Sequence, residues 1–198
     1  MGIVSKIIDD NKLTPEDIPK LEGKLFWEGP KRRINLERFA MLLLLSTIIA
    51  NYGVLKDSTA TVIGAMIIAP LMVPIVAAAA ALVMGDLNRA GRALLVVAAG
   101  VSGVIFVAFV SGAIHPIFIS FTTNSQIIGR VSPSLGDLIV ALASGVAGAF
   151  AVSRDDVADS LPGVAISISL VPPLAVTGIS LSHGEFLAAS GSFLLFIT

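Results

Sequence analysis

Two segments of this chain carry the residues best suited to binding an ion or solute, and they share one pattern. Asp57-Ser58 opens an uncharged run that reaches Pro70 twelve residues after the serine. Asp159-Ser160 opens a second run, 102 positions later, which reaches Pro172 at the same distance. The carboxylates could bind a coupling cation, and a proline inside a helix frees a backbone carbonyl. These segments therefore offer coordination by oxygen atoms.

The prolines indicate which backbone carbonyl groups have no hydrogen-bond partner within their helix. A proline has no amide hydrogen and clashes with the carbonyl four residues earlier, so each one breaks the helical ladder. In hydrocarbon such groups must face protein or a water-filled cavity. Breaks in both halves of the chain predict one shared site near the membrane midplane. The predicted positions are Met66, Ala69, Pro70, Pro74, Ile168, Ser169, Pro172 and Pro173.

The Asp-Ser pairs also have a simpler explanation as helix starts. Aspartate and serine are favoured N-cap residues, and each pair stands where an apolar run begins. We therefore favour capping over ligand binding for Asp57, Ser58, Asp159 and Ser160. Ionisable groups near a membrane interior nevertheless keep the second role open. Asn51, just before this region, is a further polar candidate that is also consistent with a helix end.

The composition places these segments in a membrane protein. The chain of 198 residues is 55% hydrophobic and 14% charged, and its mean hydropathy is +0.92. A net charge of −1 gives no reason to expect nucleic acid as a partner. The absence of cysteine removes disulfides, thiolate metal sites and cysteine catalysis. We expect no metal, no cofactor, no catalytic residue and no enzyme activity. We expect the lipid bilayer to be the main partner.

Six charge-free intervals predict six membrane-spanning helices. A span needs about 20 apolar residues, with roughly 17 still acceptable. The fourth interval is short, and the last stops in an apolar run, so we expect a sixth span that continues beyond residue 198. The intervals are Phe39–Leu55, Ser58–Gly85, Ala93–Ile114, Leu138–Ser153, Ser160–Ser182 and Phe186–Thr198.

The basic residues predict the orientation. With a cytoplasmic N-terminus, eleven of the 13 bases face the cytoplasm, and only Lys56 and Arg130 lie outside. The tail supplies most of them, but Arg89 and Arg92 in one loop and Arg154 in another agree. We therefore predict a multi-pass protein of the inner (plasma) membrane with its N-terminus in the cytoplasm.

The fold class predicted is an all-α polytopic membrane protein, a 3+3 inverted repeat. Three spans per half give the halves opposite orientations, and the second and fifth helices are broken by proline. The domains are a cytoplasmic tail with a short interfacial helix (1–33), a first membrane repeat (34–114), an external linker (115–136) and a second membrane repeat (137–198).

Two surface features bear on partners. In the tail, a helix predicted to start at Thr14 and stop at Gly23 precedes Phe26-Trp27 and Lys31-Arg32-Arg33. Aromatic and basic residues suit the headgroup region, and we favour an interfacial anchor over a lipid-binding switch. Small residues such as those at Ala77–Ala81 let helices approach closely, which leads us to expect a homo-oligomer.

The first broken segment also resembles a known family. Leu36-Glu37-Arg38-Phe39 and the run from Asp57 to Pro74, which contains IGAMIIAPLM, are similar to domain-of-unknown-function family 389. The resemblance covers roughly residues 30 to 198. It implies a bacterial or archaeal membrane protein with a shared hydrophobic core, and it implies no particular substrate.

Three functions are consistent with these features. We favour a transporter or permeation pathway for a small solute or ion, with a weak preference for a cation because no lysine or arginine lies inside a span. A non-transporting scaffold or sensor gives no reason for matched helix breaks. An intramembrane aspartyl protease would need Asp57 and Asp137 face to face, and the order of its motifs is wrong here. A cavity between Pro70 and Pro172 distinguishes transport from the scaffold.

Overall fold

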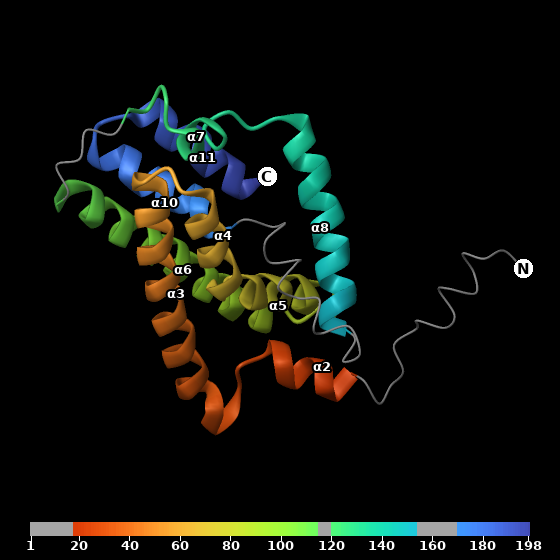
Figure 1. The fold of residues 1–198 in the computed structure, drawn as a ribbon. Helices are drawn as coiled ribbons and strands as arrows, with labels where there is room; N and C mark the ends of the chain where they lie inside the picture. Colours follow the sequence, from red (N-terminus) through yellow and green to blue (C-terminus); the bar gives the residue numbers. More distant parts are fainter. Residues whose placement is uncertain (1–17, 115–119, 154–169) are drawn as a thin grey trace, which may run out of the picture.

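The computed structural model describes residues 18–114, 120–153 and 170–198, and within these ranges the chain forms helices and no strand. Figure 1 shows the arrangement: α3, α4, α6 and α10 lie together, α2 crosses the lower end, and α8 stands to one side. The predicted all-helical class is thus confirmed for the described residues.

The N-terminal segment forms a short helix, a turn and then a long helix. α2 spans Ile18–Leu25, and the 3-10 turn η1 (Gly29–Lys31) connects it to α3 (Arg32–Leu55). The expected stop at Gly23 is wrong. The helix continues to Leu25, whose side chain is buried. The predicted start at Thr14 lies outside the described residues.

The second apolar run is broken at Pro70, as the sequence predicts. α4 (Thr59–Ile68) and α5 (Met72–Val83) meet at a bend of 49°. Ala69 takes an extended conformation (ψ 122°), as expected for a residue before proline. Pro74 falls in the first turn of α5, where an amide hydrogen would have no partner within the helix. Pro70 therefore makes the break, and Pro74 adds nothing to it.

The two helices of each of two pairs are connected by the same kind of turn. α5 connects to α6 (Leu87–Ile114) through Gly85, and α10 (Val171–Ser182) connects to α11 (Phe186–Ile197) through Gly184. The two glycines have φ of +74° and +75°, 99 positions apart. The N–H of Asp86 bonds to the carbonyl of Ala81, and that of Glu185 to Ser180, each at 2.9 Å. These are glycine caps of the Schellman type.

α10 is the central helix of the structure. All its residues from Val171 to Ser180 are buried, and it packs against α6, α3 and α11. Gly178 allows the close approach, since an added Cβ would lie 2.5 Å from the carbonyl oxygen of Ile105 in α6. A helix that is apolar on every side suits such a buried position.

The linker between the halves is docked on the bundle. It contains α7 (Ser125–Ile128) and leads into α8 (Leu135–Ser153). The side-chain amide of Asn124 donates to the carbonyl of Val54 at 2.8 Å, which attaches α7 to the end of α3. α8 makes few contacts with the other described helices, and most of its apolar side chains are exposed (Figure 1).

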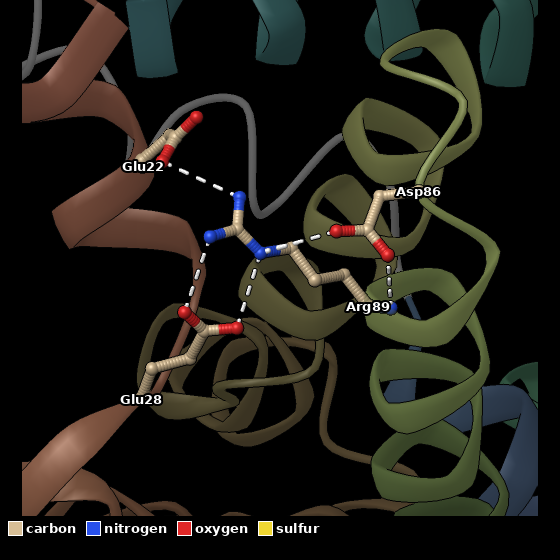
Figure 2. A network of polar contacts seen from close by, with 4 residues as sticks. All are labelled: Glu22, Glu28, Asp86 and Arg89. Atoms are coloured by element: carbon tan, nitrogen blue, oxygen red, sulfur yellow. Dashed lines mark hydrogen bonds and ion pairs between the residues drawn. The ribbon is translucent and has the colours of Figure 1, made fainter.

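Arg89, near the start of α6, ties α2 to the rest of the molecule (Figure 2). Its guanidinium lies 3.3 Å from a carboxylate oxygen of Glu22, 3.1 Å from one of Glu28 and 3.5 Å from one of Asp86. It also lies over the Phe26 ring, 4.8 Å from the centroid. The network docks the N-terminal segment on the α5–α6 turn.

The helix lengths confirm a membrane-type chain but not six spans. Three helical stretches are long and apolar enough to cross a bilayer: Ile18–Leu55, which includes α3, then Leu87–Ile114 and Leu135–Val152. The bent α4–α5 pair would make a fourth. α10 and α11 have 12 residues each, about 18 Å, which is less than the roughly 30 Å of the hydrocarbon core. The fifth and sixth spans are therefore not seen within the described residues.

Candidate functional site

A cavity of about 450 Å³ lies beside the starts of α5 and α10, and of the predicted prolines only Pro173 lines it. Its walls come from α5, α8, α10, α11 and the loop before α8. The residues lining it are Met72, Ile75, Val76, Gly129, Arg130, Asp137, Val140, Ala141, Gly145, Gly148, Leu170, Pro173, Leu195, Phe196, Ile197 and Thr198. Most of this lining is apolar, with a few polar groups, as is usual for pockets that bind small molecules.

The first turns of α5 and α10 both reach this cavity. Met72 is the first residue of α5, and Pro173 is the third residue of α10. The first turn of a helix carries the positive end of its dipole, although Pro74 in α5 and Pro172 and Pro173 in α10 supply no N–H donor there. Two such ends at one cavity favour a negative or electronegative group there.

Arg130 supplies a full positive charge to the cavity wall. Its Nη1 donates to the carbonyl of Gln126 at 2.7 Å and to the Gln126 side-chain oxygen at 3.1 Å. No carboxylate in the part of the chain that the structure describes lies within ion-pair distance of it. Burial lowers the pKa of Arg130 from its usual value, although a guanidinium stays charged at neutral pH. A half-buried charge without a counter-charge among the described residues suits an anionic ligand.

Asp137 also lines the cavity, but its carboxylate is occupied. Oδ2 of Asp137 accepts from both the backbone N–H and the hydroxyl of Ser134, each at 2.7 Å. The Ser134 hydroxyl in turn accepts from the Asp137 N–H at 3.4 Å. This reciprocal pattern is a capping box at the start of α8. Asp137 is therefore explained by helix capping.

Ser58 caps the following helix, as we favoured, whereas the side chain of Asp57 bonds elsewhere. Ser58 is the N-cap of α4, and its hydroxyl accepts from the Thr61 N–H. Asp57 has φ of +51° and ends α3, while its Oδ1 accepts from the Ser125 hydroxyl at 2.6 Å and from the Gln126 N–H at 3.1 Å. The hydrogen bond from Ser125 is the main cause of the lowered pKa of Asp57. Asp57 thus attaches α7 and does not line the cavity.

The remaining predicted positions in the first half pack inside the bundle. Met66 is buried among residues that include Val176 of α10, and Ala69 packs against a second core cluster. Pro70 lies in the break, whereas Pro74 lines a different pocket, beneath the segment after α2. The structure therefore does not gather these residues into one binding site.

Asn51 does not end its helix. It is fully buried in α3, which continues to Leu55, and its amide nitrogen donates to the Ser111 hydroxyl of α6 at 3.2 Å. Its side-chain oxygen has no partner, and neither has the buried hydroxyl of Ser180 in α10. Asn51 thus links α3 to α6.

In the second half, Pro172 and Pro173 are buried in the first turn of α10, and only Pro173 lines the cavity. The predictions for Asp159, Ser160, Ile168 and Ser169 lie outside the described residues. Arg130 was not predicted from the sequence, because only bases inside a span were considered as anion ligands. The signal available was an isolated base in an otherwise neutral polar linker.

The apolar helices and the cavity between them define a helical membrane protein. The chain belongs to the DUF389 family, since the model for this domain of unknown function matches residues 66–198. This confirms the resemblance found in the sequence.

An uncharacterised protein of Methanocaldococcus jannaschii is 34% identical to this chain over 192 residues, which cover 90% of this chain and 59% of the relative. The chain therefore spans about three fifths of the length of that relative. No solved structure matches it.

Proposed function

We propose that this protein is a membrane transporter or permeation pathway for a small solute or ion. The observation that carries the proposal is the cavity of about 450 Å³ beside the first turns of α5 and α10. Helix starts that meet at a cavity within a membrane are a common way to bind a substrate in transporters. A scaffold that binds no small molecule predicts no such cavity.

The proposed architecture behind this function is an inverted repeat. Its support is the common offset of 99 residues that relates Pro74 to Pro173 and Gly85 to Gly184. This offset of 99 residues is three shorter than the offset of 102 that relates Pro70 to Pro172 in the sequence. In such a repeat, α5 and α10 would approach the site from opposite sides of the membrane.

The charges around the cavity favour an anionic solute. Arg130 has no acidic partner among the described residues, and the helix dipoles of α5 and α10 add to its positive charge. Asp137 is the one acidic side chain in the lining, and although it stays ionised, its Oδ2 is bonded to Ser134, so the positive groups outweigh it. The preference for a cation derived from the sequence stays an untested prediction. It depended on the absence of lysine and arginine from the spans, on freed backbone carbonyls and on two aspartates. Of these, Asp57 uses its carboxylate to hold α7.

A reconstituted-vesicle experiment tests the proposal. We expect Gly145→Leu to reduce solute flux roughly tenfold, because the new side chain fills the cavity. An added Cβ at Gly145 meets nothing within 4 Å, so the helix itself tolerates the change. Gly64→Leu in α4 is the matched control, since its Cβ also meets nothing and it does not line the cavity. Equal flux in both variants, or no flux in the unchanged protein for any small ion tried, would contradict the proposal.

The sign of the solute charge is tested separately with Arg130→Gln. Loss of a charge-assisted hydrogen bond should lower the flux of small anions such as chloride, nitrate or phosphate by about tenfold. Lys56→Gln, a nearby exposed base, should leave the flux unchanged. Unchanged anion flux in Arg130→Gln, with cation flux present, would restore the cation hypothesis.

A further inference from the structure

A long apolar groove on the outside of the bundle ends at two arginines. It lies between α3 and α6, has a volume of about 510 Å³, and is lined by apolar residues such as Leu36 and Val107. Arg32 and Arg92 line it at the end where both helices begin. Along α3 its lining extends from Arg32 to Thr47, about 22 Å, which exceeds the roughly 15 Å depth of one bilayer leaflet.

Two glycines of α6 shape the groove. An added Cβ on Gly100 would lie 3.1 Å from side-chain atoms of Leu71 and Phe39, so this position is filled by close helix packing. An added Cβ on Gly103 would meet nothing within 4 Å. The groove is therefore open at Gly103, and a larger side chain there would occupy it.

The two arginines differ from their neighbour Arg89. Arg89 faces three carboxylates, whereas Arg32 and Arg92 are exposed and have no acidic partner in residues 18–114, 120–153 or 170–198. Both also line a second pocket of about 340 Å³, together with Trp27 and Glu28. Two unpaired guanidinium groups thus stand where a polar pocket joins an apolar groove.

We propose that this surface binds an anionic phospholipid. The phosphate lies at Arg32 and Arg92, the rest of the headgroup enters the pocket beside Trp27, and one acyl chain lies in the α3–α6 groove. Guanidinium groups bind phosphate oxygens with two parallel hydrogen bonds, and unpaired bases at a membrane surface attract anionic lipid. A free phosphate would use the arginines and leave the groove empty, so the apolar length favours a lipid. The proposal needs only the membrane setting and is independent of transport.

Native mass spectrometry of the full chain in detergent tests it. We expect phosphatidylglycerol to bind at least roughly tenfold more tightly than phosphatidylcholine with the same acyl chains. The double variant Arg32→Gln/Arg92→Gln should lose this preference. Arg38→Gln is the matched control, since Arg38 is an exposed base of the same helix that lines neither cavity.

A second variant tests the acyl-chain groove. Gly103→Leu should weaken binding of both lipids and keep the preference for phosphatidylglycerol, while Gly64→Leu should change neither. Equal binding of the two lipids by the unchanged protein, or a preference that survives the double arginine variant, would overturn the proposal. Full competition by inorganic phosphate, with no effect of Gly103→Leu, would show an anion site and overturn the lipid assignment. Thermal unfolding of each variant verifies that it is folded.

Discussion

The pairs α5–α6 and α10–α11 are built from the same local parts but occupy different places. Each begins with a proline in the third position of its first helix and turns at a glycine with φ near +75°. α10 is nevertheless fully buried, whereas α5 has exposed residues and lies next to α2. The same turn and helix start can thus serve a central helix in one half and a peripheral one in the other.

One difference in contacts follows the shared offset of 99. The Pro173 carbonyl accepts the hydroxyls of Thr177 and Ser192 at 2.9 and 2.8 Å. The corresponding residues in the first pair are Ala78 and Ala93, which cannot donate. Hydroxyl groups bonded to backbone carbonyls let α10 keep polar side chains in a buried position.

The largest difference between the two pairs should appear at Gly178. In Gly178→Leu, the side chain would collide with Ala108 and with the backbone of Ile105 and Phe109, so we expect a loss of about 3 kcal/mol or failure to fold. The equivalent change in α5, Ala79→Leu, places the side chain at an exposed position and should cost less than about 0.5 kcal/mol. Chemical denaturation in detergent measures both. Equal losses would mean that α5 is as tightly packed as α10.

The shared turns should respond alike to substitution. Alanine at Gly85 or Gly184 must adopt a left-handed conformation, which costs about 1–2 kcal/mol for a residue with a Cβ. Neither added Cβ meets another atom within 4 Å, so conformational strain is the whole effect expected. Melting temperatures of the two variants should therefore fall by similar amounts. A large drop in only one would show that the turns are not equivalent.

The smallest effect is expected from Ser192→Ala. It removes the hydrogen bond to the Pro173 carbonyl, and Thr177 still satisfies that acceptor, so a loss of about 1 kcal/mol is expected. The variant gives α11 the alanine that α6 carries at Ala93. Denaturation of Ser192→Ala, Thr177→Ala and the double variant measures how the two bonds share the carbonyl. A double variant as stable as the unchanged protein would show that these bonds do not stabilise α10.

Several features of the fold could be predicted from local sequence. The break at Pro70 follows from the missing amide hydrogen, and the cap at Ser58 follows from its position before an apolar run. The partners of Asp57 could not be predicted in the same way, because α7 lies almost 70 residues further along the chain. Pro74 was misread because its effect depends on whether it falls within a helix or in the first turn.

The candidate site was predicted in its general region but not in its residues. The prolines pointed to the starts of α5 and α10, and Pro173 does line the cavity. Arg130 reaches the same cavity from a polar loop, and Gly145 reaches it from α8. Nothing in their own neighbourhoods in the sequence relates them to α5 or α10.

The sequence alone determined the membrane class, the family and the break in the second apolar run. Each of these depends on composition or on backbone chemistry within a few residues. Only the tertiary structure decided that α10 is central, that Asp57 holds α7, and that Arg130 lines a cavity without an acidic partner among the described residues. The physical reason is that lipid and protein interiors are similarly apolar, so hydrophobicity identifies helices for a membrane without specifying which faces pack together.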